Sequence, residues 1–151
     1  MLRTGQGAQR SQSMASTTLP PPTLGIRHIA LRVRDLAASE GFYTGLLGYR
    51  VEWRPDPDNV YLTSGGDNLA LHRAARAGPV QDAADVGALD HFGILLRSPE
   101  DVDAWARHLR AGGAALQAEP RTHRDGARSF YVRDPEGNML QFIYHPPLSG
   151  D

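Results

Sequence analysis

Two stretches of the sequence decide the fold, and they resemble one another. Residues 25–34 read GIRHIALRVR and residues 88–97 read ALDHFGILLR, so the second stretch repeats the first at a spacing of 63 residues. Each is an apolar run of strand type with a His at the same place, and each leads through a polar cap into a helix signal. A repeat on this scale indicates two copies of one supersecondary unit.

The same order of elements follows each copy of the repeat. The first copy predicts a helix over residues 35–45. In the second copy, Ser98 as N-cap and Pro99 in the first turn predict a helix that stops at Gly112. Three short strands then follow each helix, over 49–54, 59–63 and 68–73 in the first copy and over 115–118, 127–133 and 139–144 in the second. Each copy therefore reads β-α-β-β-β, and the fold class is α+β, with a curved mixed sheet and the helices outside it.

The folded domain is expected over residues 24–146. It divides into a first module (24–74), a small and polar linker (75–87) and a second module (88–146), followed by a tail (147–151). Residues 1–23 are rich in Gln, Ser, Thr and Gly, which is typical of a disordered leader. This leader carries Arg and Ser but no acidic residue, so two alternatives stay open: an organelle transit peptide, or an alternative start at Met14.

The composition excludes several classes of function. The chain of 151 residues has a formal net charge of -1, which argues against a nucleic-acid arm or a polybasic membrane patch. No apolar run approaches the roughly 20 residues of a transmembrane helix, so we expect a cytoplasmic protein with a small-molecule partner. The absence of Cys excludes disulfides, thiolate metal ligands and Cys nucleophiles. All sixteen basic residues are Arg, which excludes Lys chemistry.

Alternation along the strands predicts a polar face opposite the apolar one. His28 shares its face with Arg32, and the same reading places His72, His91 and Gln141 on the polar faces of their strands. The helices are expected to cover the apolar faces, which leaves a polar-lined concavity that suits a ligand. Pseudo-symmetry would bring the two first strands together at the centre of this cup.

The polar face offers a set of residues for a divalent metal ion. Imidazole nitrogens are common ligands of zinc, nickel, iron and manganese, and an amide oxygen can complete such a set. The candidate ligands are His28, His91 and Gln141, with His72 as a further one. Solvated or hydrogen-bonded polar residues on a sheet are the alternative interpretation, and for the repeated pair of His the two interpretations are balanced.

Other residues of the same face point to a substrate. Tyr131, ten residues before Gln141 across a turn, would place a phenol near the metal as an acid or donor. Arg32, Arg133, Arg128 and His123 are candidates for binding an anionic or oxygen-rich ligand, because the guanidinium fork suits carboxylate or phosphate. An ordinary strand Tyr and a solvated basic loop are the alternatives.

Three segments resemble the vicinal oxygen chelate superfamily: residues 26–33 (IRHIALRV), 42–49 (FYTGLLGY) and 129–138 (SFYVRDPEGN). This superfamily contains glyoxalase I, extradiol dioxygenases, fosfomycin-resistance enzymes, methylmalonyl-CoA epimerase and bleomycin-resistance proteins. The resemblance covers about residues 24–146 and implies paired βαβββ modules that form a cup. It also implies a homodimer in which His28 of one subunit joins His91 and Gln141 of its partner, since short members usually build the cup between subunits.

The resemblance implies a ligand set, and this chain departs from it. Enzymatic members hold a metal with a His or Gln on the first strand, a His on the matching strand and a Glu on the last strand. His28 and His91 match the first two positions, but Gln141 stands at the position of the Glu. Ala70 stands where glyoxalase I carries another Glu. Because a neutral amide adds no charge and takes no proton, the resemblance implies a weaker metal site and argues against proton abstraction by a ligand.

Two hypotheses of function follow. The first is a metal-dependent lyase, isomerase or dioxygenase that chelates two neighbouring substrate oxygens. Through Tyr131 and His123 the chain resembles the extradiol dioxygenases, but their usual ligand set is two His and one carboxylate, whereas this chain has Gln141. The second is a metal-free protein that sequesters or presents a small molecule in the same cup. The His pair favours the first hypothesis, and Gln141 favours the second.

Overall fold

The computed structural model describes residues 22–74 and 89–149. The predicted linker over 75–87 lies outside these described residues, and so does the predicted leader apart from its last two residues. The first module consists of β1 (His28–Val33), α1 (Leu36–Gly41), a π-helical turn η1 (Phe42–Leu46), β2 (Arg50–Asp56), β3 (Asn59–Thr63) and β4 (Asn68–Arg73). The second consists of β5 (Phe92–Leu96), α2 (Pro99–Ala111), β6 (Leu116–Thr122), β7 (Arg128–Arg133) and β8 (Met139–Tyr144), and a short α3 (Pro146–Ser149) follows. The predicted βαβββ order is confirmed in both copies.

The two modules have the same strand topology. The first sheet has the order β1-β4-β3-β2 and the second the order β5-β8-β7-β6. In each sheet the first strand runs parallel to the last one, and the other neighbours are antiparallel. The α+β class is therefore confirmed, with two mixed four-stranded sheets.

Two strands run further than the sequence predicts. We expected β2 to end before Pro55 and β6 to end before Pro120, yet β2 reaches Asp56 and β6 reaches Thr122. Both are the outermost strands of their sheets on the side away from β1 and β5. A Pro is tolerated there because an edge strand has one side on which no ladder hydrogen bond is needed.

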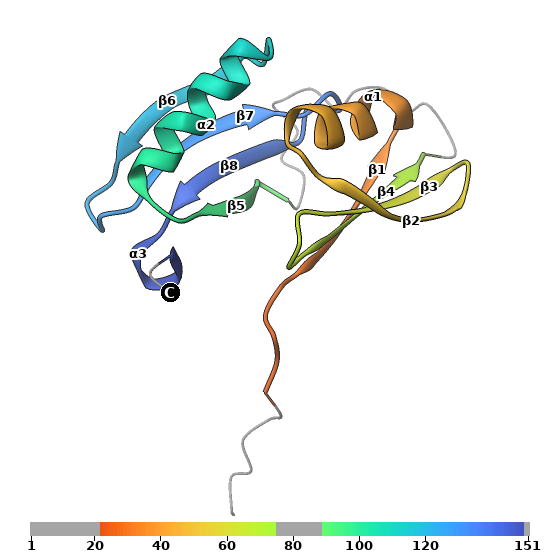
Figure 1. Ribbon diagram of the computed structural model, residues 1–151, viewed down its shortest axis with the longest axis horizontal. Coiled ribbons are helices and arrows are strands. Elements are labelled where there is room, and N and C mark those ends of the chain that lie inside the picture. The colour runs from red at the N-terminus through yellow and green to blue at the C-terminus, as the bar shows by residue number, and fades with distance from the viewer. Residues whose placement is uncertain (1–21, 75–88, 150–151) are drawn as a thin grey trace, which may run out of the picture.

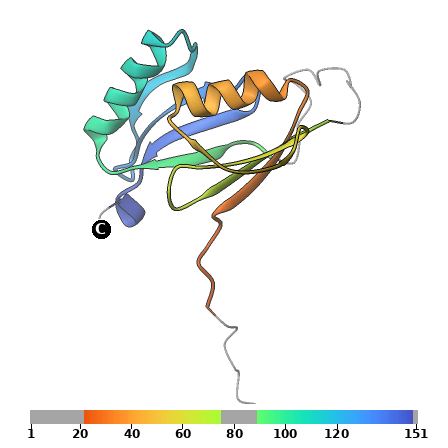
Figure 2. The same ribbon diagram turned by 45° about the vertical axis from the view of Figure 1, so that its right-hand side comes forward.

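The helices cover one face of the sheets, as Figures 1 and 2 show: α1 lies over the first sheet and α2 over the second. The strand faces beneath them form the core, in which Phe130 and Phe142 stack with ring centroids 5.1 Å apart. The predicted alternation is confirmed in β1, where Leu31 and Val33 are buried and Arg32 is exposed. We call the opposite face of each sheet, which the helices leave uncovered, the ligand face.

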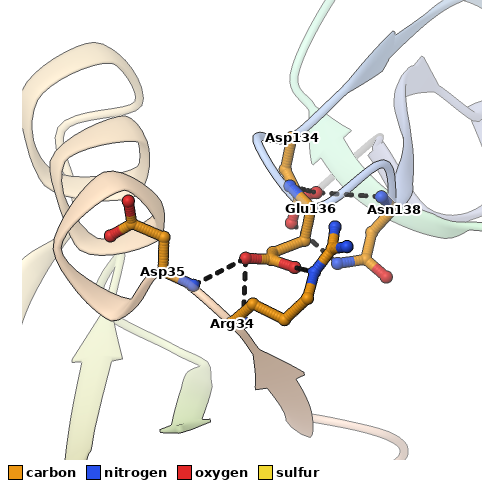
Figure 3. A network of polar contacts seen from close by, with 5 residues as sticks. All are labelled: Arg34, Asp35, Asp134, Glu136 and Asn138. Carbon is orange, nitrogen blue, oxygen red and sulfur yellow. Dashed lines mark hydrogen bonds and ion pairs between the residues drawn. The ribbon is translucent and has the colours of Figure 1, made fainter. Parts of the chain in front are cut away.

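Polar contacts join the two modules through the turn between β7 and β8. Figure 3 shows Glu136 of this turn accepting hydrogen bonds from the backbone N–H groups of Arg34 and Asp35, each at 2.8 Å, while its second oxygen pairs with Arg34 Nε at 2.9 Å. The hydroxyl of Tyr43 donates to Asp134 at 2.8 Å. The first turn of one module is therefore fastened to the last hairpin of the other.

The two sheets do not join into one. Neither ladder connects β1 to β5, so each of these strands is the edge of its own sheet. A hollow of about 460 Å³ lies between them, with Ile29 and Leu69 on one side and Phe92 and Ile94 on the other. The expected meeting of the two first strands at the centre of a cup therefore does not occur as a hydrogen-bonded pair within one chain. No helix in residues 22–74 or 89–149 is long and apolar enough to cross a bilayer.

Candidate metal and ligand site

The register of the first sheet fixes what lies next to His28. In the parallel pair of β1 and β4, His28 is opposite Asn68, Ala30 is opposite Ala70, and Arg32 is opposite His72. His28 Nδ1 is 2.7 Å from the Oδ1 of Asn68, and within the described residues its Nε2 has no hydrogen-bond partner. His28 is exposed on the ligand face, so this nitrogen is available to a ligand.

The second sheet brings three of the predicted residues together. Gln141 of β8 is opposite Tyr131 of β7 in the register. The Tyr131 ring meets the ring of His91 edge to face, with centroids 5.5 Å apart. His91 precedes β5 by one residue, and its Nδ1 pairs with the carboxylate of Asp90. A carboxylate on one imidazole nitrogen is the arrangement that orients metal-binding His in proteins, and it leaves Nε2 as the free donor.

A hydroxyl of β7 holds the remaining polar side chains of this cluster. Ser129 Oγ is buried and accepts a hydrogen bond from Nε2 of Gln141 at 3.1 Å, and the same oxygen lies 2.9 Å from Nε2 of His123. Within residues 22–74 and 89–149 the amide oxygen of Gln141 has no hydrogen-bond partner. An open groove of about 410 Å³ lies beside it, and its lining includes His123, Arg124 and Ile143.

His72 lies apart from His28 although both belong to the first sheet. It is four residues beyond Asn68 along β4, which corresponds to about 13 Å. Its Nδ1 is 2.5 Å from the Oδ1 of Asn59 on the neighbouring strand. Arg32 is its partner in the register, so Arg32 and His72 form the far end of the ligand face. We therefore do not place His72 in one ligand set with His28.

The two Arg residues of β7 also separate. Arg133 shares the face of Tyr131, and its Nη1 donates to the backbone oxygen of Gly137 at 2.6 Å, which holds the hairpin turn. Arg128 is one residue out of phase with this face, and its guanidinium pairs with Asp103 of α2 at 2.6 Å. Strand alternation therefore turns Arg128 to the helix-covered side, and its role in binding substrate stays a prediction.

Each proposed ligand has the chemistry that a divalent cation requires. The second polar atom of each side chain is held by a neighbour: Asn68 holds His28, Asp90 holds His91 and Ser129 holds Gln141. In the part of the chain that the structure describes, one atom of each therefore remains without a partner: Nε2 of His28, Nε2 of His91 and Oε1 of Gln141. His28 belongs to the first sheet, whereas Gln141 belongs to the second sheet and His91 directly precedes it. Residues 22–74 and 89–149 contain no group of three His, Asp or Glu placed to hold a metal ion.

Two phenols of the first module, the buried Tyr43 and the half-buried Tyr49, serve the fold rather than this site. Burial raises the pKa of Tyr43 far above its usual value, and the neighbouring Asp134 carboxylate raises it further. Burial, followed by Asp67, likewise raises the pKa of Tyr49. Both hydroxyls therefore stay protonated and act as hydrogen-bond donors.

Sequence reasoning missed the residues that hold the candidate ligands. Alternation placed Ser129 on the ligand face, but only the register shows that it lies between His123 and Gln141. Asn68 was read as the first residue of a strand, and its place beside His28 depends on the parallel pairing of β1 and β4. Asp90 directly precedes His91 in the sequence, and this adjacency was the one signal available.

With this geometry in place, comparison with known proteins identifies the family. A profile of the Glyoxalase/Bleomycin resistance protein/Dioxygenase superfamily matches residues 25–142. The chain belongs to this superfamily. The match covers both modules, from the residues before β1 into β8, so the predicted relationship is confirmed.

Members of the superfamily with different activities resemble the chain. It is 31% identical to a trivalent organoarsenical cleaving enzyme of Bacillus sp. strain MD1, over 80% of this chain and 79% of that protein. It is 28% identical to a manganese-dependent 2,3-dihydroxybiphenyl 1,2-dioxygenase of Geobacillus genomosp. 3, over 78% of this chain and 35% of that protein. The chain spans less than half the length of the dioxygenases that it matches. A solved lactoylglutathione lyase from Agrobacterium tumefaciens is 25% identical with a TM-score of 0.68, over 85% of this chain and 98% of that one.

Proposed function

We propose that this protein is a metal-dependent enzyme that binds a small substrate through two neighbouring oxygen atoms. The proposed ligands of the divalent ion (zinc, nickel, iron or manganese) are His28, His91 and Gln141. The observation that carries the proposal is that each of them has one polar atom held by a neighbour and the other free. His72 shows the same arrangement, so it is the combination with position that singles these three residues out: they match the positions at which enzymatic members of the superfamily hold their metal, and a second polar atom held by a neighbour is usual for metal-binding side chains.

We further propose that two subunits share the site, so that His28 of one copy meets His91 and Gln141 of the other. The placement of the two His in different sheets supports this, as do the unpaired edges of β1 and β5. Apolar side chains near these edges are exposed: Leu24 at 81%, Ile26 at 92% and Leu95 at 47%. Residues 22–27 extend away from the sheets in both views (Figures 1 and 2), where a second subunit would cover them.

The reaction class that fits best is oxygenation of a substrate with vicinal oxygens. A bound ion would act as a Lewis acid toward these two oxygens. Gln141 takes no proton, so an isomerase that uses a ligand carboxylate as its base fits this set poorly. Tyr131, in contact with the ring of His91, is placed to donate a hydrogen bond to a substrate oxygen, and His123 stands behind Gln141 at the groove. The dioxygenases among the relatives support this choice.

An organoarsenical substrate fits the residues less well, although one relative bears that name. Trivalent arsenic is a soft centre that prefers thiolate ligands, and the sequence contains no Cys. Oxygen-rich substrates match the imidazole, phenol and guanidinium groups of the ligand face better. Arg124 at the groove would favour one that carries negative charge.

The second candidate is a metal-free binding protein, which the neutral Gln141 favours.

Metal analysis separates the metal-dependent enzyme from the metal-free binding protein. The untagged protein, purified without a chelating column, is incubated with iron(II), manganese, nickel or zinc and desalted, and its metal content is compared with that of a His28→Ala, His91→Ala double variant. His108→Ala is the control, because the His108 ring contacts the backbone oxygen of Leu46 in η1 and not the proposed ligands. We expect the wild type and this control to retain metal that the double variant loses. Equal retention by the wild type and the double variant for every ion would overturn the metal proposal in favour of the binding protein. Oxygen uptake with a panel of catechols then tests the reaction class.

A further inference from the structure

A chain of two hydrogen bonds runs across the first sheet from His28 to a carboxylate. His28 Nδ1 is 2.7 Å from Asn68 Oδ1, and Asn68 Nδ2 donates to Glu52 Oε2 at 2.5 Å. The three residues come from β1, β4 and β2 and lie on the ligand face. Nothing in the superfamily relationship assigns a role to Asn68 or Glu52.

We propose that Asn68 is a positioning residue that Glu52 orients, and that together they hold His28 in the tautomer with its proton on Nδ1. This tautomer presents Nε2 as a lone-pair donor. The inference rests on the proposed function for its purpose, because a lone pair on Nε2 is what a metal ion or an acidic substrate group needs. The tautomer itself is a property of the metal-free protein and can be measured separately.

The direction of the two bonds follows from what each group can do. A carboxylate only accepts hydrogen bonds, so the Asn68 atom that faces Glu52 must be the NH₂ group. The amide oxygen then faces His28, and because that oxygen also only accepts, the hydrogen must sit on Nδ1. If the amide were turned round, its NH₂ group would face the ring and its oxygen would face the carboxylate. Glu52 therefore determines the tautomer of a ring that it does not touch.

The backbone of β2 explains how Glu52 reaches Asn68. In the antiparallel pair of β2 and β3, Val51 is opposite Leu62 and Trp53 is opposite Tyr61, so Glu52 is one extra residue on the β2 side. Such a bulge re-aims a side chain and is common beside functional sites. A regular strand in this register would have no place for Glu52 between these two pairs.

The same sheet contains an internal comparison. His72 Nδ1 lies 2.5 Å from Asn59 Oδ1, and Asn59 Nδ2 lies 2.8 Å from both carboxylate oxygens of Asp56. Asp56 and Asn59 flank the tight turn between β2 and β3, and Asp56 also accepts from the backbone N–H of Asp58. That second chain therefore secures a hairpin. It has the bonds of the first chain but lies at the other end of the ligand face, which makes it a matched control.

The test is the ring nitrogen spectrum of His28 in the metal-free protein, measured by ¹⁵N NMR at a pH where the ring is neutral. We expect the wild type to carry the proton on Nδ1. Asn68→Leu is expected to shift the population toward the Nε2–H form, whereas Asn68→Asp, which retains an acceptor for Nδ1, keeps it. Glu52→Ala, on an edge strand where folding tolerates truncation, is expected to shift the population in the same direction as Asn68→Leu. Asn59→Leu is expected to leave His28 unchanged.

Metal titration of the same variants gives the second readout. We expect Asn68→Leu to weaken the affinity for the divalent ion by about 10- to 100-fold, the usual effect of losing such a partner, and Asn59→Leu to leave it unchanged. Two results would overturn the positioning role even if metal binds. One is a wild-type His28 ring with its proton on Nε2, and the other is a ring that keeps the Nδ1–H form in both Asn68→Leu and Glu52→Ala. The expected tautomers in a protein that retains no metal would instead uphold the positioning role and reject the proposed function.

Discussion

The hydroxyl of Tyr43 donates a hydrogen bond to the buried carboxylate of Asp134, 91 residues away in the sequence, at 2.8 Å. Tyr43 belongs to the segment FYTGLLGY and Asp134 to the segment SFYVRDPEGN, two of the three segments on which the family resemblance rests. The same carboxylate accepts hydrogen bonds from the backbone N–H groups of Glu136 and Asn138 and so closes the β7–β8 turn. The two motifs therefore report on one contact between the modules, which is why they indicate the fold and not the reaction.

We expect Tyr43→Phe to lower the free energy of unfolding by about 1–3 kcal/mol, because a buried carboxylate loses one of its donors while the shape of the core is kept. Chemical denaturation measures the change. Tyr61→Phe is the control: this half-buried Tyr packs against Trp53 and His72, its hydroxyl has no hydrogen bond within the described residues, and the expected change is within about 0.5 kcal/mol. Equal effects of the two substitutions would contradict the role assigned to the Tyr43 hydroxyl.

The contact between Glu136 and Arg34 predicts a dependence of stability on pH. Burial raises the pKa of Glu136, but the hydrogen bonds from the backbone of Asp35, the Arg34 side chain and the Arg34 backbone outweigh it, and the pKa lies below the ordinary value of 4.5. A carboxyl with a lowered pKa stabilises the folded state fully above the unfolded pKa, and this stabilisation is lost as the pH falls through the folded pKa. As the pH is lowered past about 4.5, the denaturant concentration at the midpoint of unfolding should therefore decrease. The decrease should be smaller in Glu136→Gln. Parallel pH curves for the two proteins would rule out this contribution.

Ser39 provides a prediction of the opposite sign. Its side chain is fully buried in α1, and its Oγ has no hydrogen-bond partner among the described residues. Ser39→Ala removes an unsatisfied polar atom and adds a better helix former, so we expect an increase in stability of about 0.5–1 kcal/mol. Ser98→Ala makes the same chemical change at the N-cap of α2, where Oγ accepts from Asp101 N–H, and should cost about 1 kcal/mol. Thermal unfolding of both variants tests the pair, and a destabilised Ser39→Ala would mean that its hydroxyl has a partner.

Much of the fold could be predicted because it depends on short-range patterns. The 63-residue repeat, the caps at Ser98 and Gly112 and the turns around Pro57 and Gly137 define the elements, and three strands begin and end where the sequence places them. The strands predicted over 49–54 and 115–118 are too short, because a local pattern does not show that both are sheet edges, where Pro55 and Pro120 are tolerated.

The candidate site was predictable only in part, because faces follow from alternation but neighbours follow from register. Alternation placed His28, Tyr131 and Gln141 on the ligand face. It also placed His72 there, and only the pairing of His28 with Asn68 shows that His72 lies four residues away along β4. His28 and His91 belong to two separate sheets, and the arrangement of two whole modules is something that no local pattern encodes.

Gln141→Glu tests whether residue 141 is a ligand. A carboxylate in place of the amide adds a negative charge to the site, so we expect the affinity for a divalent ion to rise by about tenfold or more. Calorimetric titration with manganese or iron(II) measures this affinity. Gln117→Glu, on the exposed part of β6, adds the same charge elsewhere and should leave the affinity nearly unchanged. An unaltered affinity in Gln141→Glu would remove residue 141 from the ligand set.

We propose that His28 of one subunit and His91 of the other hold one metal ion. The most direct measurement mixes two variants, His28→Ala and His91→Ala, after partial unfolding and refolding that allow subunits to exchange. In a mixed dimer, one of the two shared sites lacks both His and the other keeps both. We therefore predict that neither variant retains metal alone but that the mixture does, at one ion per mixed dimer. If the mixture retains no more metal than either variant alone although mixed dimers have formed, the shared site is contradicted.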